Sequence, residues 1–533
     1  MQNSPVAKIT VLAAAACAAA LADFTPDRSV MSEAYWNIWT PEALAKMDAD
    51  IEKYRKADAT VEVSAPDGAE VSVEQVTHAF FFGAHIFNFN QLGTSERNAR
   101  YKELYSSRIA PGVSLFNSAT VAFYWRTFER EPLKPRFEEA AEDTEAFWNE
   151  CKSPKTQPHW RRPPTDPVIA YLQSRGVRIH GHPLVWGNNA WMTPNWLWDK
   201  FCPESEKRAL EEATGVKVPV WDASLPAGLK NVKEGEWCKA WNEIYKKLKG
   251  EEIARLVPTF LKAQNVFYDK RICDIAARYG SRVDSWDVVN ESATDFHRFG
   301  DKAVRNRPFD GSHYGPMPAD YAFKAFQWAG KYMPKTAWFN LNDYASSAIV
   351  ASQAKDLMAH GARINSIGSQ MHLFNPKESL KIMEGKGPAH LTPKGVAARF
   401  RAASAAGLPI ILSEITITAP DLSPKGQMAQ AIITRNMYRA WFSVEKMIGI
   451  TWWNVVDDCG APGEPSMSGL FTRDMKPKTA YYAMDDLLNR EWRTKATAKA
   501  QGGKVAFRGF RGKYRITWKG ADGREQSKIV DVK

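Results

Sequence analysis

Short apolar runs separated by stretches of helical periodicity dominate the chain from about residue 79 onward. Most of these runs are continuously apolar, which is typical of parallel strands buried on both faces. Eight runs occur, at residues 79–87, 112–120, 177–186, 283–292, 336–344, 364–374, 408–417 and 448–458. Eight alternating strand–helix units predict an α/β fold, a (β/α)8 TIM barrel, with the active site at the strand C-termini.

The pattern differs at both ends of the chain. Residues 23–58 have apolar positions at helical spacing, and the following stretch alternates around Asp67-Gly68, which predicts a β-hairpin. The last segment alternates again between glycine turns and is basic. We therefore expect small β-rich appendages at both termini: a helix and hairpin extension over 23–75, a barrel domain over 76–487, and a β appendage over 488–533.

One interior stretch also breaks the alternation. Residues 187–260 are long, rich in Trp and irregular in pattern. Because the stretch follows the third predicted strand, we interpret it as an insertion in a βα loop that forms a wall of the cleft.

The N-terminal residues 1–22 have the composition of a secretory signal peptide. Lys8 precedes an apolar run from Ile9 to Leu21, and Ala20-Leu21-Ala22 has the small residues of a cleavage site. The run is short for a bilayer span. Export to the periplasm or the medium is therefore expected; lipoprotein anchoring at Cys17 is the less favoured alternative, because Ala14–Ala16 fit that signal poorly.

Composition and charge exclude only a few classes of protein. With 533 residues, 44% of them hydrophobic, the chain can build one large barrel with appendages. The formal charge of +11 is dispersed, and no nucleic-acid-binding motif accompanies it. Five cysteines follow the predicted signal, and none has zinc-site spacing, so we expect no zinc site. Whether any of them pair stays open.

Polar side chains come at the ends of the predicted strands. In a closed barrel these ends meet at one mouth, and strands four and seven lie across it from each other. The candidates are His182 on strand three, Asn290 and Glu291 on strand four, Gln370 and His372 on strand six, Glu414 on strand seven and Trp453 on strand eight.

Two carboxylates at the ends of apolar strands suggest a specific chemistry. Glycoside hydrolysis uses one carboxyl group as proton donor and a second as nucleophile or base. Glu291 and Glu414 could sit on opposite sides of one cleft, and Trp453 could form an apolar floor for a sugar ring. A single glutamate at a strand end is more often a partner in a loop ion pair, so the hypothesis depends on the two occurring together with the neighbouring Asn, His, Gln and Trp.

The motifs at these positions resemble those of a known family. In order along the chain they are FGAHIF (82–87), FNSAT (116–120), GHPLVW (181–186), WDVVNE (286–291), SQMHLF (369–374), LSEITI (412–417) and ITWWNVVD (450–457). Together they resemble glycoside hydrolase family 10, the endo-β-1,4-xylanase family, over roughly residues 75–487. The resemblance implies a barrel that hydrolyses with retention and without a cofactor.

The resemblance also assigns roles to residues of this chain. Glu291 falls on the acid/base and Glu414 on the nucleophile. The residues that fall on sugar-binding positions, or on positions that hold the nucleophile, are His182, Trp186, Asn290, Gln370, His372 and Trp453.

One segment departs from the family. After FNSAT the family continues with a Pro-Glu-Asn stretch and a Lys that bind the next sugar on the non-reducing side. Here the chain reads VAFYWRTFE, with Ala122 and Phe123 in place of the Glu and Asn, and Arg126 standing in for the Lys as a substrate-binding residue. Gly187 replaces a usual His. The chain is thus identified as a divergent member.

The expected function is that of an exported, monomeric, retaining glycoside hydrolase that cleaves β-1,4-linked xylan or xylo-oligosaccharides. Two alternatives stay open. One is a retaining β-glycosidase for another or a heavily decorated plant glycan, which the altered segment favours. The other is a non-catalytic carbohydrate-binding barrel, against which the presence of both carboxylates argues.

Overall fold

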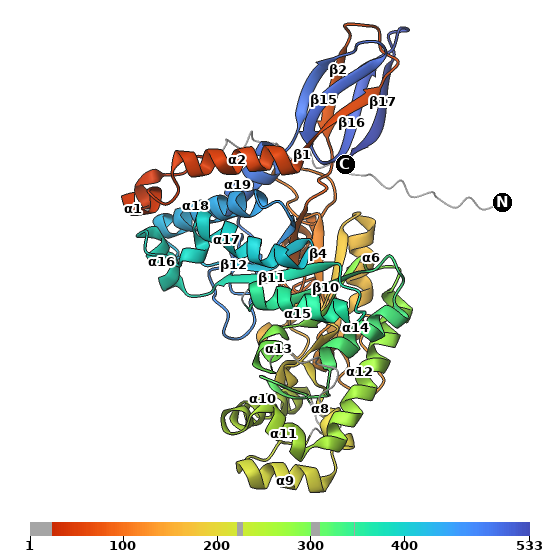
Figure 1. The fold of residues 1–533 in the computed structure, drawn as a ribbon, viewed down its shortest axis with the longest axis vertical. Coiled ribbons are helices and arrows are strands. Elements are labelled where there is room, and N and C mark those ends of the chain that lie inside the picture. The colour runs from red at the N-terminus through yellow and green to blue at the C-terminus, as the bar shows by residue number, and fades with distance from the viewer. Residues whose placement is uncertain (1–23, 221–226, 300–309, 346) are drawn as a thin grey trace, which may run out of the picture.

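The computed structural model describes residues 24–220, 227–299, 310–345 and 347–533. A parallel barrel forms the middle of the molecule, a group of antiparallel strands projects from one end, and a set of helices forms the other end (Figure 1). The predicted signal peptide and Cys17 lie outside the described residues.

Eight parallel strands close into the barrel. Their order is β10-β11-β12-β13-β3-β4-β5-β7, and β7 pairs with β10 to complete the ring. The two-residue strand β6 (Val185–Trp186) adds to β7 as a ninth member of the sheet. The eight barrel strands are β3 (Phe81–His85), β4 (Ser118–Ala122), β5 (Arg178–His182), β7 (Ser285–Asn290), β10 (Trp338–Asp343), β11 (Ser366–Leu373), β12 (Ile410–Ile417) and β13 (Met447–Trp452).

The predicted (β/α)8 barrel is therefore confirmed, and each of the eight apolar runs overlaps one barrel strand. Every residue of β4, β7 and β12 is buried, as the continuous apolar runs indicated. The second run was the least accurate prediction, because β4 begins only at Ser118 and the residues before it form a turn.

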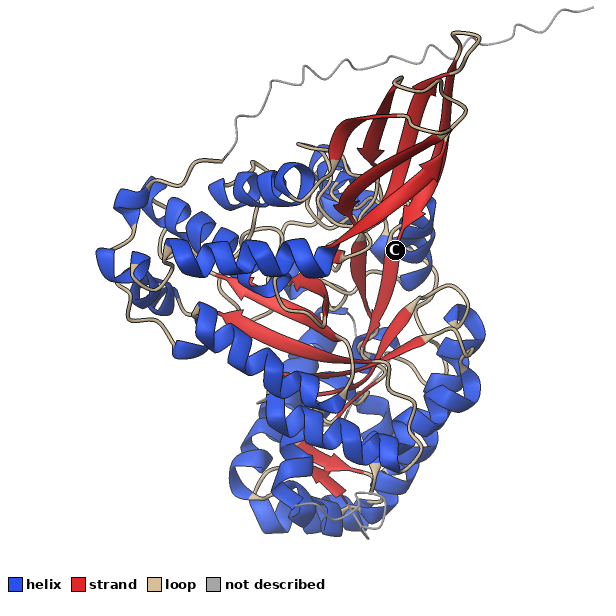
Figure 2. Cartoon of the chain, turned by 45° about the horizontal axis from the view of Figure 1, so that its top comes forward, coloured by secondary structure: helices blue, strands red, loops and turns tan. Residues whose placement is uncertain are grey.

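Helices cover the outside of the barrel strands (Figure 2). Several begin with a capping side chain followed by proline, the usual signal for a helix start. Thr392 caps α17, and Ser423 caps α18, each accepting from a backbone N–H three residues on. The helices that follow barrel strands are α3 (Ser95–Glu103), α4 (Trp125–Phe128), α5 (Glu145–Glu150), α6 (Thr165–Ser174), α12 (Pro258–Tyr279), α13 (Ala293–Phe299), α14 (Tyr321–Tyr332), α15 (Ser347–Ala359), α16 (Pro376–Met383), α17 (Pro393–Ala403), α18 (Pro424–Phe442) and α19 (Thr479–Asp486).

The insertion after the third barrel strand is helical rather than irregular. Four of its Trp residues, Trp196, Trp198, Trp237 and Trp241, are buried in the core of these helices, and the rings of Trp198 and Trp241, and of Trp198 and Phe260, lie 5.1 Å apart. The spacing of aromatic residues concealed the helical period in the sequence. The helices are α7 (Asn189–Met192), α8 (Asn195–Phe201), α9 (Glu204–Thr214), α10 (Ala227–Lys247) and α11 (Gly250–Leu256), and they lead into α12.

The two terminal appendages form one β module. It contains β1 (Lys56–Glu62), β2 (Glu70–Gln75), β14 (Lys495–Lys499), β15 (Lys504–Phe510), β16 (Gly512–Lys519) and β17 (Glu525–Val532). Strand β1 pairs with β15, and β2 lies between β14 and β16. The predicted β-hairpin is therefore wrong, because in the described chain each N-terminal strand pairs with C-terminal strands and not with the other. Their shared core includes Val71, Val73, Tyr514 and Ile516.

The β module lies at the end of the barrel opposite the expected site. Strand β2 ends at Gln75 and β3 begins at Phe81, so the chain passes from the module into the N-terminal ends of the barrel strands. The short helix α1 (Glu33–Trp36) and the longer α2 (Pro41–Arg55) precede the module, and Arg439 of α18 holds α2 through an ion pair with Asp48 at 2.6 Å.

Two further features concern export and redox state. Within the described ranges, none of the helices has the length and apolar character that crossing a membrane requires. The five described cysteines, Cys151, Cys202, Cys238, Cys273 and Cys459, are all free thiols.

Candidate active site

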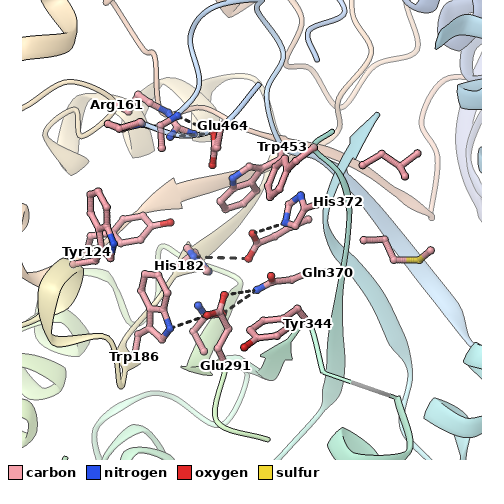
Figure 3. Close-up of a pocket in the computed structure, with 18 of the residues that line it drawn as sticks. Tyr124, Arg161, His182, Trp186, Glu291, Tyr344, Gln370, His372, Trp453 and Glu464 are labelled. Atoms are coloured by element: carbon pink, nitrogen blue, oxygen red, sulfur yellow. Dashed lines mark hydrogen bonds and ion pairs between the residues drawn. The ribbon is translucent and has the colours of Figure 1, made fainter. Parts of the chain in front are cut away.

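A cleft with a cavity volume of about 560 Å³ opens at the C-terminal ends of the barrel strands (Figure 3). Every predicted site residue except Arg126 lines it, so the barrel brings together side chains from six strands or strand ends. The predicted members are His182, Trp186, Asn290, Glu291, Gln370, His372, Glu414 and Trp453.

Glu291 follows the last residue of β7 in a left-handed backbone conformation, with φ of 55°. Such a conformation is uncommon for a residue other than glycine and is found where surrounding contacts hold it in place. Here the Glu291 N–H donates to the carbonyl of Asn342 on the neighbouring strand at 2.8 Å. The turn ends the strand at Asn290 and redirects the next side chain into the cleft.

Three side chains donate to the Glu291 carboxylate. Trp186 Nε1 and the Tyr314 hydroxyl reach Oε2 at 3.1 and 2.6 Å, and Gln370 Nε2 reaches Oε1 at 3.1 Å. A hydroxyl can donate to a carboxylate or accept from a carboxylic acid. The contact with Tyr314 can therefore persist in both protonation states of Glu291, as a group that gives and takes a proton requires.

Glu414 lies inside β12, level with Gln370 of β11. Asn342 Nδ2 donates to Oε1 at 2.9 Å, while His372 Nε2 lies 3.4 Å from Oε2. Burial raises the pKa of Glu414 to about 8, and the charge of Glu291 adds to this rise, whereas His182 and the Asn342 bond oppose it. The two carboxylates are thus electrostatically coupled across the cleft.

Gln370, Asn290 and Asn342 connect the two carboxylates through amide hydrogen bonds. Asn342 Nδ2 donates both to Glu414 and to Asn290 Oδ1, the latter at 2.8 Å. Gln370 Nε2 donates to Glu291 and lies 3.5 Å from the same Asn290 oxygen. This network links the carboxylates of β7 and β12 through side chains of the two strands between them, β10 and β11, and gives the rigidity that preorganised charge stabilisation needs.

A buried aspartate on β7 orients the histidines of β5. Asp287 accepts from His182 Nδ1 at 2.7 Å and from Asn340 Nδ2 at 2.6 Å, and His180 Nε2 lies 2.9 Å away. Burial alone would raise the pKa of Asp287, but His180 and His182 outweigh it and hold the pKa well below its usual range. Because an ionised carboxylate only accepts, His182 Nδ1 carries a proton and its Nε2 faces Glu414 at 4.0 Å.

His372 is the second histidine beside Glu414. Burial lowers its pKa to about 4, so the ring is neutral at neutral pH. Its Nδ1 lies 2.9 Å from the Thr416 hydroxyl, which can donate to it, leaving the N–H on Nε2 directed at Glu414. His372 is therefore a neutral hydrogen-bond donor toward Glu414.

Aromatic rings line the cleft around the carboxylates. The Trp453 ring lies 5.5 Å from the ring of His182 at nearly a right angle, and Tyr124 lies 5.4 Å from the same histidine. Trp191, Tyr344 and Phe374 also line the cleft and leave 44%, 45% and 38% of their surfaces exposed. Exposed aromatic faces in a polar cleft are suited to stacking against sugar rings.

Arg126 does not line the cleft, so its predicted role in substrate binding is corrected. Its side chain is 7% exposed, donates to the Ala190 carbonyl and lies over the ring of Trp237, inside the packing of the helical insertion. Arg126 was predicted to bind substrate because it occupies the sequence position of the family's lysine. In the structure, the first turn of α4 directs its side chain toward the helical insertion.

Sequence reasoning missed several cleft residues. Tyr314 sits between β8 (Asp310–Ser312) and β9 (Gly315–Met317), a hairpin that carried no strand signal. Tyr124, two residues past β4, was part of the divergent segment and was not assigned a role. Arg161 and Arg162 come from the loop between β4 and α6. In the sequence, only the presence of two consecutive arginines could have suggested that they line a binding site.

The donor set does not resemble a metal centre. Among the described residues, no group of three or more His, Cys, Asp and Glu side chains is arranged to hold a metal ion. The carboxylates of Glu291 and Glu414 are instead surrounded by amide, indole and imidazole donors, which is an arrangement for proton transfer and nucleophilic attack.

Fold and site together define a (β/α)8 barrel with a coupled pair of carboxylates at the strand C-termini. Comparison with known proteins agrees with this class. The model of Glycosyl hydrolase family 10 matches residues 251–487, which include both carboxylates. Over these residues, somewhat less than half of its length, the chain is similar to this family.

The similar proteins are distant. The chain is 26% identical to Endo-1,4-beta-xylanase C of Paenibacillus barcinonensis over 46% of this chain and 24% of that protein. It is 27% identical to Endo-1,4-beta-xylanase 2 of Claviceps purpurea over 40% of this chain and 57% of that protein. The chain therefore spans about a quarter of the length of the first relative and somewhat over half of the length of the second. The crystal structure of xylanase B from Clostridium stercorarium F9 aligns with a TM-score of 0.46 and 17% identity, covering 76% of this chain and 97% of that one.

Proposed function

We propose that the chain is a retaining glycoside hydrolase that cleaves β-1,4-linked xylan or xylo-oligosaccharides. The observation that carries the proposal is the coupling of Glu291 and Glu414 through one amide network at the mouth of the barrel. The family match supports the reaction class, and the names of the two relatives support xylan as the substrate. An extracellular or periplasmic place of action accompanies the proposal, since residues 1–22 have the composition of an export signal.

In the first step, Glu414 attacks the anomeric carbon of the bound sugar while Glu291 gives its proton to the glycosidic oxygen. The bond to the leaving sugar breaks, and a glycosyl ester forms on Glu414. In the second step, Glu291 takes a proton from water, and the water oxygen attacks the same carbon and releases Glu414. Two inversions at one carbon return the original configuration.

The surrounding residues support these steps. Asn342 and His372 donate toward Glu414 and stabilise its ionised form before attack and after release. Tyr314 and Gln370 hold the Glu291 carboxyl group in place as it loses and regains a proton. The aromatic rings of Trp186 and Trp453 line the same cleft and provide faces for the sugar.

The test compares the purified chain with Glu291→Gln on arabinoxylan and on an aryl β-xyloside whose phenol is a good leaving group. On the polymer, loss of the acid should lower kcat/KM by roughly 10²–10⁴-fold, while formation of the intermediate from the aryl substrate should be affected much less, since a good leaving group needs little protonation. Glu103→Gln, an exposed change on α3, is the matched control. Following the anomeric proton of the first product by NMR tests retention.

Two outcomes would reject the proposal. Equal loss on both substrates would show that Glu291 is not the acid. Release of a product with inverted configuration would exclude Glu414 as a nucleophile. Binding of xylo-oligosaccharides without any turnover would instead support the non-catalytic barrel.

A further inference from the structure

Two consecutive arginines line the cleft beside Tyr124. Arg161 and Arg162 follow Trp160 in the loop that leads from β4 to α6. Arg161 lies at the ends of β3 and β13, where its Nη2 is 3.2 Å from His85 Nε2 and from Asn454 Oδ1. Figure 3 shows Arg161 and Glu464 together on one side of the cleft and Tyr124 between them and Trp186.

The two arginines differ in their charge partners. Arg161 Nη1 lies 3.5 Å from Glu464 Oε2, and its side chain is 4% exposed. Arg162 has no carboxylate within ion-pair distance among the described residues; its side chain donates from Nη1 to the Arg161 carbonyl at 2.8 Å. Arg161 is therefore a directly paired cation, whereas Arg162 makes no direct ion pair and is influenced by the charge of Glu464 only from beyond ion-pair distance.

Arg162 is held in place without a counterion. Its guanidinium carbon lies 3.7 Å from the centre of the Tyr124 ring and 5.4 Å from that of Phe87. Burial lowers its pKa to about 10, so the group is still a cation at neutral pH. Stacking fixes the plane of the guanidinium, and a fixed plane loses less entropy when it binds a planar anion.

The ring that supports Arg162 belongs to the same part of the cleft as the residues beside the carboxylates. The Tyr124 ring that supports it contacts the rings of His182 and Trp186, at 5.4 and 6.2 Å. The charge of Glu414 also acts on Tyr124, where it adds to the effect of burial in raising the pKa. A ligand group that met Arg162 would therefore belong to the reacting sugar or to its immediate neighbour.

We propose that Arg162 binds the carboxylate of a uronic acid carried by the substrate. The inference rests on the proposed function and narrows its substrate class to acidic, uronate-bearing xylan. An arginine fork matches a carboxylate with two parallel hydrogen bonds, which a neutral sugar hydroxyl does not provide. The absence of a direct ion pair among the described residues and the stacking on Tyr124 leave the Arg162 guanidinium placed to receive an anion at this point of the cleft.

The test compares glucuronoxylan with the same polymer after chemical reduction of its carboxyl groups to alcohols. The measured quantity is the ratio of kcat/KM for the acidic polymer to that for the reduced polymer. A charge-assisted pair of hydrogen bonds corresponds to roughly a 10- to 100-fold preference in the wild type. Arg162→Gln should bring the ratio close to one, and Arg162→Lys should leave an intermediate ratio, because a lysine keeps the charge but not the fork.

Arg363→Gln is the matched control. Arg363 also stacks on an aromatic ring, 3.9 Å from the centre of Phe339, and donates to backbone carbonyls, but it precedes β11 at the opposite end of the barrel. This variant should keep the wild-type ratio. Circular dichroism melting of each variant separates a binding effect from a loss of folding.

The outcomes separate this inference from the proposed function. A wild-type ratio near one, or an unchanged ratio in Arg162→Gln, overturns the inference while hydrolysis of both polymers upholds the function. Should neither polymer be cleaved, the proposed function fails. Calorimetric titration with a uronate-bearing xylo-oligosaccharide and its carboxyl-reduced form then decides the inference alone, and equal affinities would overturn it.

Discussion

Replacing Glu414 by Gln should stabilise the folded chain at alkaline pH. The side chain is 6% exposed and its pKa rises from its ordinary value of 4.5 to about 8, with burial as the main cause. A carboxyl group whose pKa is higher in the folded state binds a proton more tightly there than in the unfolded state. The Glu414 carboxyl group therefore lowers the stability of the folded state as pH rises from about 4.5 to 8. Glutamine has no charge, so the substitution removes this destabilisation.

The magnitude follows from the pKa change. Each pKa unit corresponds to about 1.4 kcal/mol, so a rise from 4.5 to about 8 makes the ionised form roughly 5 kcal/mol less favourable in the folded chain. Coupling to the charge of Glu291 supplies part of this figure. We expect Glu414→Gln to gain on the order of several kcal/mol over the wild type at pH 8.5, and little at pH 4.5.

The assay is urea unfolding of both proteins at pH 4.5 and pH 8.5, with the change in midpoint multiplied by the common slope. Glu464→Gln is the control, because it should change the stability at pH 8.5 in the opposite direction. Burial opposes ionisation of Glu464, but Arg161 and hydrogen bonds from Ala461 and Asn454 hold its pKa below the usual range. Its removal should therefore destabilise the chain at pH 8.5. The reasoning is refuted if Glu414→Gln changes the midpoint equally at both pH values.

The remaining predictions concern the supports of the site. A 2-fluoro-xyloside with an activated leaving group should trap Glu414 at a rate that rises with pH to a plateau above about pH 8. Glu291→Gln should lower the midpoint of this pH profile, because the charge of Glu291 contributes to the raised pKa of Glu414. An unchanged midpoint would contradict the electrostatic coupling of the two carboxylates. Asp287→Ala should cost roughly 3–5 kcal/mol in urea unfolding, because it leaves three buried donors without their acceptor; a cost below about 1 kcal/mol would speak against this. Gly181→Ala should cost about 1–3 kcal/mol by thermal melting, because the new Cβ would lie 2.3 Å from the Trp286 ring, and an unchanged Tm would show that the ring can move.

The site is organised around groups whose burial is unfavourable in isolation. Glu414 is buried beside Glu291, and the Arg162 cation lies in the cleft without a carboxylate partner among the described residues. Such arrangements reduce folding stability and are typical of functional sites, where ligand binding supplies the missing interaction. The large apolar core and the closed sheet of the barrel can tolerate this loss.

The eight barrel strands could be predicted from the sequence because parallel strands buried on both faces need continuous apolar runs. Strand ends in such a barrel meet at one mouth, so the place of Glu291 and Glu414 followed from their position after apolar runs. The motif order then supplied their roles. The strand positions depend on local sequence patterns, and the meeting of the strand ends depends on a closed barrel topology that permits few other arrangements.

Other features depended on contacts between segments far apart in the chain. The pairing of β1 with β15, and of β2 with β14 and β16, could not be read from the sequence, because alternation shows that a segment is a strand but not which strand it joins. The direction of Arg126 was decided by packing against the helical insertion, since a residue on the first turn of a helix can face several neighbours. Only the tertiary structure showed that Arg161 is paired and Arg162 is not, because charge compensation is set by distance in space and the two residues are adjacent in sequence.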